Sequence, residues 1–189
     1  MFLRKVMHMR VAITLTAVLL AATAGAQEPK SRPSFDDFPV KKVWKGKPAA
    51  PKLVTEDDRM FRTRIRLGAK APVEFAGHYT MPRWGCGTSC SVLVIVDSIT
   101  GRVYDGVGAT DLPGAWIEEH PAESYPRWEF HANSRLIKVN GCPNEENCGF
   151  YDYEMVDGKG LKLIRKELLP KHYQPECDYG TTQKKECSL

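Results

Sequence analysis

The chain lacks any apolar run long enough to cross a bilayer as a helix. Its longest such run, Val11–Ala22, falls short of the roughly 20 residues that a span requires. It also lacks the Gly-rich phosphate loops, the GxSxG elbow, the HExxH zinc motif and the EF-hand loop. No internal repeat of fixed period is present. These absences exclude a helical membrane protein, a repeat protein and the enzyme classes that those motifs mark.

Acidic residues are absent from Met1–Arg10, which is basic. The short apolar run Val11–Ala22 follows, and Ala24-Gly25-Ala26 then supplies a small-x-small cleavage site. These are the three parts of a secretory signal peptide, so we predict one over residues 1–26. Cleavage between Ala26 and Gln27 would deliver the protein to the periplasm or the medium. No cysteine lies beside the site, which argues against a lipoprotein anchor.

An excess of charge of one sign is also missing once the leader is set aside. The full chain carries 27 Lys and Arg against 23 Asp and Glu. Arg4, Lys5 and Arg10 lie in the predicted leader, and their removal lowers the excess of basic residues from four to one. A nearly neutral domain does not favour binding driven by net charge, so we expect no nucleic-acid partner.

All six cysteines lie beyond the predicted leader and fall into three local couples. Short polar or Gly-rich loops separate the members of each couple in the segments GCGTSC, CPNEENC and CDYGTTQKKEC. An even number of cysteines behind an export signal is typical of a disulfide framework. The predicted pairs are Cys86–Cys90, Cys142–Cys148 and, with less core around it, Cys177–Cys187.

Two other chemistries for the cysteines stay open. Neither the CxxxC nor the CxxxxxC spacing matches the CxxC knuckle of a structural zinc site, so we expect no metal and no cofactor. His78 and Cys86 are candidates for a base and a thiol nucleophile, but an oxidising compartment consumes free thiols. We therefore assign no catalytic residue.

Prolines recur in residues 27–52, which we predict to form an extended arm. Phe35, Phe38 and Trp44 are too apolar for a free linker, so the arm is expected to lie on the domain surface. The lysines of the arm are Lys41, Lys42, Lys45 and Lys47. This local basicity suits either a solvated edge or contact with an anionic partner.

Capping and charge signals predict one helix over residues 56–69. Thr55 provides an N-cap with Asp58 three residues later, and Pro72 follows the helix. Phe61 and Ile65 share an apolar face. The helix also carries a basic stripe of Arg59, Arg62 and Arg66. We interpret the stripe as a solvated face or, alternatively, as a binding face for anions.

From residue 75 onward the apolar period shortens to that of strands. Alternation predicts a half-buried strand over Phe75–Met81, ended by Pro82 and Gly85. The continuous apolar run in Ser91–Asp97 predicts a strand buried on both faces, the most buried one of the sheet. Gly106–Tyr125 is rich in Gly, Pro and acid and predicts a long irregular loop. Turn signals at Gly101 and within residues 157–160 predict two hairpins. Further strands are predicted at Arg102–Gly106, Phe150–Val156 and Leu161–Leu168, and Trp128–His131 with Ser134–Asn140 forms either a strand pair or one broken strand.

The predicted order is an arm, a helix and then about five to seven antiparallel strands. This order is typical of an α+β fold, mainly an antiparallel meander with one N-terminal helix. No helix-period segment lies between strands, which excludes a doubly wound parallel sheet. We expect a signal peptide over 1–26, an arm over 27–52, one α+β domain over 53–170 and a polar tail with two cysteines over 171–189.

Three segments carry the most distinctive pattern of the chain: FAGHYTMPRWGCGTSC, VDSITGRVYDG and SRLIKVNG. Together with the final hairpin YDYEMVDGKGLKLI, they resemble an uncharacterised family of small secreted bacterial proteins with a FAGHY…WGCGTxC…TGxVY…SRL pattern. The resemblance spans roughly Phe35 to Leu168. It implies export and a shared fold, and it brings no activity, substrate or catalytic residue.

The sequence shows no activated nucleophile, so we predict an exported, disulfide-stapled binding or envelope-associated module without enzymatic activity. Its partner is expected to be an envelope component or a protein. The candidates for lining a ligand site are His78, Tyr79, Arg83 and Trp84. We interpret His78 as structural, because no Asp or Glu is spaced to orient it. The alternative is a secreted enzyme, either a Cys/His thiol enzyme or a carbohydrate hydrolase that uses the loop carboxylates Glu118, Glu119, Glu123 and Glu129.

Overall fold

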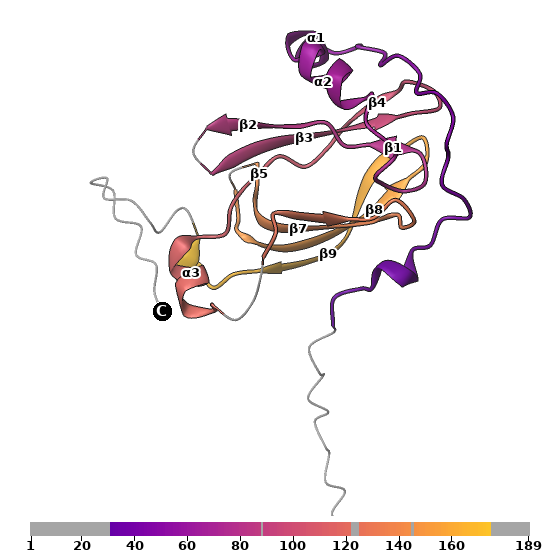
Figure 1. The fold of residues 1–189 in the computed structure, drawn as a ribbon. Helices are drawn as coiled ribbons and strands as arrows, with labels where there is room; N and C mark the ends of the chain where they lie inside the picture. The colour runs from indigo at the N-terminus through magenta and orange to yellow at the C-terminus, as the bar shows by residue number, and fades with distance from the viewer. Residues whose placement is uncertain (1–30, 88, 122–124, 145, 175–189) are drawn as a thin grey trace, which may run out of the picture. The chain divides into compact units, whose positions relative to one another are not determined.

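A computed structural model describes residues 31–87, 89–121, 125–144 and 146–174 (Figure 1). From Arg32 onward the described residues belong to one compact unit. The predicted signal peptide over 1–26 and the predicted Cys177–Cys187 pair lie outside the described residues. Among the helices of the described part, none is long and apolar enough to cross a membrane.

The fold is mainly antiparallel β-sheet with few helices, as predicted. Within the described residues the strands form a 9-stranded sheet in the order β1-β3-β5-β7-β8-β9, with β2 and β4 paired to β3 and β6 paired to β7. The strand number exceeds the expected five to seven because short pieces such as β1 and β5 join the sheet. The strands are β1 (Tyr79–Thr80), β2 (Arg83–Gly87), β3 (Cys90–Asp97), β4 (Val103–Asp105), β5 (Ala109–Thr110), β6 (Trp128–Phe130), β7 (Leu136–Pro143), β8 (Gly149–Val156) and β9 (Gly160–Leu168).

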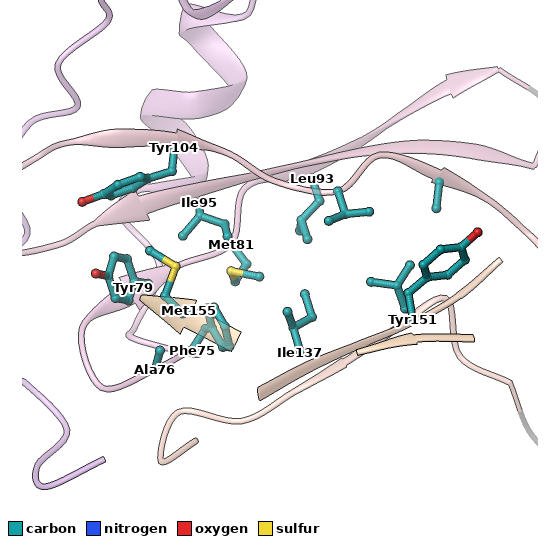
Figure 2. Close-up of a cluster of buried hydrophobic side chains, with 13 residues drawn as sticks. Phe75, Ala76, Tyr79, Met81, Leu93, Ile95, Tyr104, Ile137, Tyr151 and Met155 are labelled. Atoms are coloured by element: carbon teal, nitrogen blue, oxygen red, sulfur yellow. The ribbon is translucent and has the colours of Figure 1, made fainter. Parts of the chain in front are cut away.

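The sheet folds over itself and encloses the main core. In Figure 1, β2, β3 and β4 form one layer, β7, β8 and β9 form another, and β5 lies between them. Leu93 and Ile95 project from β3 toward Ile137 on β7 (Figure 2). Met155 on β8 joins this cluster and is fully buried. Alternate residues of each strand therefore face a shared interior, as period-2 patterning requires.

A second apolar cluster lies on the other face of β3, under the helices. Ile65 and Ala69 of the helical segment pack with Trp84 and Val96. The prediction that β3 is buried on both faces holds in part, because both faces are covered but Val92 and Val94 on the helix side are only half-buried. The prediction that it is the most buried strand is wrong, because β7 has a larger share of buried residues than β3. β7 pairs with β5 and β6 along one edge and with β8 along the other, and no local pattern marks that central position.

The helix predicted over 56–69 is divided into α1 (Glu56–Met60) and α2 (Arg62–Gly68). The break lies at Phe61, where φ is −95° and ψ is 16°, and its ring packs at 5.1 Å from that of Trp84. The predicted capping box is present, since Thr55 and Asp58 exchange hydrogen bonds. The other helices are α3 (Gly114–Glu119) and the 3-10 helices Phe35–Asp37 and Lys171–Tyr173.

The predicted strand over Phe75–Met81 is wrong over most of its length. Ala76 and Gly77 have φ values of 42° and 84°, so the chain turns sharply before the short β1. The Tyr79 amide donates to the Phe75 carbonyl across this turn, at 3.0 Å. A turn with positive φ at an alanine and a glycine breaks the alternation that the pattern suggested.

Two further boundaries differ from the prediction. Pro82 and Gly85 do not end strand pairing, because β2 continues over Arg83–Gly87 as the partner of β3. The segment Gly106–Tyr125 is not wholly irregular, because it contains β5 and α3. Both elements depend on contacts with distant parts of the chain: β5 pairs with β7, and Trp116 of α3 packs against Phe150 and Tyr173.

Two disulfides close the ends of hairpins, in the local pairing that the spacing predicts. Cys86 is bonded to Cys90 at the junction of β2 and β3. Cys142 is bonded to Cys148 between β7 and β8, directly after the paired residues Gly141 and Gly149. The chain is thus stapled where two pairs of neighbouring strands meet.

Candidate functional site

The arm is held along the domain by backbone hydrogen bonds that extend over much of its length. The amides of Val40 and Trp44 donate to the carbonyls of Asn133 and Gly77, at 3.0 and 2.7 Å. Farther along, the Lys52 amide donates to the Gly101 carbonyl at 2.7 Å. The arm therefore contacts the β6–β7 turn, the turn before β1 and the β3–β4 turn, and its backbone has a fixed position relative to them.

A buried ionic contact anchors the start of the arm. Asp152 on β8 is fully buried, and the guanidinium of Arg32 donates to it at 3.0 Å. Arg32 also donates to the amide oxygen of Asn140, and Arg165 on β9 lies 3.3 Å from the second carboxylate oxygen. A buried carboxylate needs such partners to offset its desolvation. This contact fixes where the arm begins.

A groove lies between the arm and the turn that carries His78. Two adjoining hollows share Lys42 and His78 in their walls. The first hollow is lined by Lys42, Val43, Trp44, Lys45, Gly46, Gly77, His78 and Ile99. The second is lined by Pro39, Val40, Lys41, Lys42, Ala76, His78, Arg135 and Asp157. His78 is thus the one predicted site residue that both hollows share.

The His78 imidazole lies between two carboxylates. Its Nε2 atom is 4.0 Å from Asp97 Oδ1 and 3.9 Å from Asp157 Oδ1, and 22% of its side chain is exposed. The interpretation that no acid is placed to orient His78 is therefore wrong. Both acids belong to hairpins: Asp97 ends β3, and Asp157 follows β8. These distances allow ion pairing when the imidazole is protonated and exceed those of a direct hydrogen bond.

The two carboxylates differ in exposure and in what holds them. Asp97 is nearly buried, and its oxygens accept hydrogen bonds from the amides of Ile99 and Thr100 and from the Thr100 hydroxyl. Asp157 has a side chain that is 72% exposed. Asp97 is therefore a fixed part of the turn, whereas Asp157 faces the groove and the solvent.

Tyr79 lies under His78 rather than in the groove. Its ring is 1% exposed, and its centroid lies 4.1 Å from that of His78. The Tyr79 hydroxyl donates to Asp157 at 3.0 Å. Burial, followed by this hydrogen bond and the charge of Asp157, raises the pKa of Tyr79 well above its usual range. Tyr79 therefore stays protonated and supports His78 and Asp157 from below.

The other predicted ligand-lining residues lie elsewhere. Arg83 pairs with Glu74 at 3.2 Å, and its guanidinium lies over the Phe130 ring. Trp84 is 8% exposed and lines a separate hollow with Phe61. The structure thus brings together His78 and Tyr79 but places Arg83 and Trp84 outside the two hollows of the arm groove.

Two of the loop carboxylates have hydrogen-bond partners elsewhere in the described part of the chain. Glu119 accepts a hydrogen bond from the Tyr173 hydroxyl, and Glu129 accepts one from the Asn140 amide. Glu123 lies outside the described residues.

The four cysteines at 86, 90, 142 and 148 are disulfide-bonded, so none of them provides a thiol nucleophile. Within the described ranges, no cluster of His, Cys, Asp or Glu is arranged to hold a metal ion.

The residues that sequence reasoning missed are Asp97 and Asp157. Both belong to hairpin signals, in DSITG and DGKG, but their proximity to His78 depends on how the two hairpins fold around the turn at Gly77.

Comparison with models of protein families, with curated proteins and with solved structures finds no match to this chain.

Proposed function

We propose that the protein is an exported, disulfide-stapled binding module that holds an anionic glycan of the cell envelope in the arm groove. The observation that carries the proposal is the composition of the groove wall, where Lys42, Trp44, Lys45 and His78 come together. The backbone hydrogen bonds that Val40 and Trp44 donate support it, because they hold the arm wall of the groove in place without a ligand. The predicted signal peptide supports the envelope as the compartment.

The lysines of the groove have no anionic partner within the described part of the chain. Lys41, Lys42 and Lys45 take part in none of the ion pairs found among the described residues, and all three side chains are exposed. No acidic residue occurs between Asp37 and Glu56. Their ammonium groups are therefore available to an anion from outside the protein.

Trp44 supplies an apolar wall beside these charges. A Cβ atom at Gly46 would lie 2.3 Å from the Trp44 ring, so the indole folds back over that glycine. The side chain is only half-buried and lines the groove with Ile99. An aromatic face combined with cations suits a polymer that has both sugar rings and anionic groups, since the rings pack on indole and the anions pair with lysine.

The proposal is tested with a sulfated dextran as probe and neutral dextran as its control. We expect the exported chain to bind the sulfated polymer, and Lys42→Glu with Lys45→Glu to weaken binding by about tenfold or more. Trp44→Ala is expected to weaken it with less change in its salt dependence. Isothermal titration calorimetry measures each affinity.

A matched control separates the groove from general charge. Lys162→Glu with Lys166→Glu makes the same charge change on exposed positions of β9. If that variant loses as much affinity as the groove variant, the polymer binds by net charge and the groove proposal is wrong.

The position of His78 favours a second candidate function, hydrolysis of the bound glycan. An imidazole between two carboxylates, partly exposed in a groove, has the placement of a general acid–base. Release of reducing ends from envelope glycans would measure such an activity. His78→Asn would abolish it and leave binding intact if His78 is catalytic. Equal loss of binding and hydrolysis would instead assign His78 to the groove wall.

A further inference from the structure

The outer face of α1 and α2 exposes two large apolar side chains. Met60 is 64% exposed and Leu67 is 63% exposed. Met60 ends α1 and Leu67 lies in the last turn of α2, so each of the two helices exposes one of them. Isolated exposed apolar residues are common on protein surfaces, but these two lie among several exposed basic side chains.

The same outer face is strongly basic. Its exposed cations are Arg59, Arg62, Arg64, Arg66 and Lys70. None of them forms an ion pair with another described residue; Arg62 donates only to the carbonyl of Arg59, at 3.1 Å. Arg59 and Arg66 each precede one of the exposed apolar residues. Cations therefore surround the two apolar side chains.

The acidic residues of this region lie at one end and to one side. Glu56, Asp57 and Asp58 occupy the first turn of α1, where Asp58 is buried and exchanges hydrogen bonds with the N-cap residue Thr55. Asp57, Asp58 and Asp105 line a hollow toward β4, together with Phe61. No acid occurs between Arg59 and Lys70. Over Glu56–Lys70 the five cations therefore outnumber the three acids, and no acid lies among the cations.

The opposite face of the helices is fixed to the sheet, so the outer face cannot turn inward. Ile65 is 1% exposed and packs with Trp84 and Val96. A Cβ atom at Gly68 would lie 2.6 Å from the Pro82 side chain, which shows how closely α2 approaches the strand layer. Figure 1 shows both helices lying over β2 and β3. The fold thus presents Met60, Leu67 and their cations outward.

We propose that this outer face of α1 and α2, defined by Arg59, Met60, Arg62, Arg64, Arg66, Leu67 and Lys70, docks on the surface of an anionic phospholipid bilayer. Met60 and Leu67 enter the headgroup layer, and the arginines and Lys70 meet lipid phosphates. Basic residues beside exposed apolar ones are the composition of interfacial helices, which lie on a membrane without crossing it. The face is separate from the arm groove and does not depend on its ligand.

The positive charge of this outer face favours an anionic lipid surface over a protein as its binding partner. The patch combines a dense set of unpaired cations with only two separated apolar anchors, and it lacks the aromatic cluster that dominates tight protein interfaces. Each cation near an anionic bilayer adds to the attraction, so several together suffice for reversible binding.

Co-sedimentation with vesicles tests the proposal on the exported chain. We expect binding to vesicles of equal parts phosphatidylglycerol and phosphatidylcholine, little binding to phosphatidylcholine alone, and release at high salt. Arg62→Glu with Arg66→Glu should lower the partition coefficient by about tenfold or more. Met60→Ser with Leu67→Ser should lower it by a similar factor even at low salt.

Matched variants on β9 provide the controls, because that strand also exposes apolar and basic side chains. Leu163→Ser with Ile164→Ser, and Lys162→Glu with Lys166→Glu, should bind vesicles as the unmodified chain does. Circular dichroism establishes that each variant is folded. The proposal is overturned if the unmodified chain does not bind anionic vesicles. It is also overturned if the helix variants bind vesicles as well as the unmodified chain, or if the β9 controls lose as much vesicle binding as the helix variants. Retention of sulfated dextran binding by the helix variants shows that the groove is unaffected.

Discussion

Burial changes the acid–base behaviour of two core tyrosines. The pKa of Tyr79 is raised by burial and by its hydrogen bond to Asp157, and burial beside Tyr151 raises the pKa of Tyr153 to about 12. In the unfolded chain both return to the ordinary tyrosine value of about 10. Above that pH the folded state holds protons that the unfolded state has lost, so the free energy of unfolding falls as pH rises.

This alkaline loss of stability can be measured by guanidinium unfolding on either side of about pH 10. We expect no contribution from these groups below that pH, and a fall approaching about 1.4 kcal/mol per pH unit for each of them above it. Tyr79→Phe with Tyr153→Phe should flatten the curve. An equally steep fall in the double variant would assign the alkaline sensitivity to other groups.

Ile95 tests the main core at the level of a single side chain. It has no exposed surface and lies between β3 and the β7–β8 layer. Ile95→Ala removes buried methyl groups and leaves a cavity, so we expect a loss of about 2–5 kcal/mol in the free energy of unfolding. Leu163→Ala, at a residue that is 43% exposed, should stay within about 0.5 kcal/mol. A loss below about 1 kcal/mol at Ile95 would show that the core relaxes around it.

The environment of His78 shows where residue-level reasoning from sequence stops. The alternation from Phe75 to Met81 suggested a regular strand, in which no acid is spaced to reach the imidazole. Positive φ values at Ala76 and Gly77 turn the chain, and Asp97 and Asp157 approach from hairpins distant in sequence. Local patterns cannot encode that meeting, because it depends on how the hairpins are placed in the folded sheet.

At the scale of elements, the close approach of α2 to the sheet makes Gly68 a sensitive position. An alanine there favours the helix by propensity, yet its Cβ would lie 2.6 Å from Pro82. We expect Gly68→Ala to cost about 1–3 kcal/mol by overpacking. Gly114→Ala in α3 is the matched control, since no atom lies within 4 Å of its Cβ. Thermal unfolding of both variants compares them, and stabilisation by Gly68→Ala would show that α2 can move away from β2.

Elements with strong local signals were predictable, and those that rest on distant contacts were not. Thr55 and Asp58 form the expected cap, and Gly101 and Gly158 take the positive φ values that the hairpin turns require. In contrast, α3 has no side-chain cap and gains its position from Trp116, which packs on Tyr173 and Phe150. The surrounding segment Gly106–Tyr125 is rich in Gly, Pro and acid, so the local pattern predicts a loop.

At the scale of the molecule, the sequence indicates an antiparallel α+β fold but not how its layers pack. The periods of the apolar residues determine which faces are buried, and the short turns require antiparallel neighbours. The folding of the sheet over itself depends on β5, a strand of two residues that joins β3 to β7. The arm anchor between Arg32 and Asp152 likewise joins residues that are 120 positions apart. Neither connection has a local signature.

The two described disulfides should contribute unequally to the stability of the whole unit. Both close short loops, for which the chain-entropy model gives roughly 2–3 kcal/mol each. Cys142 and Cys148 are 4% and 0% exposed and belong to an apolar cluster with Leu169 and Tyr173, whereas Cys86 lies exposed at the end of β2. Removing the buried pair therefore loses packing in addition to the cross-link.

We expect Cys142→Ala with Cys148→Ala to lower the free energy of unfolding by more than Cys86→Ala with Cys90→Ala does. The buried variant should also lose near-ultraviolet dichroism from the neighbouring aromatic rings. Limited reduction under native conditions should open Cys86–Cys90 first, because a thiolate reaches an exposed sulfur without unfolding. Peptide mapping after alkylation identifies the bond that opens. Faster reduction of Cys142–Cys148 would mean that the β7–β8 end opens more readily than its burial implies.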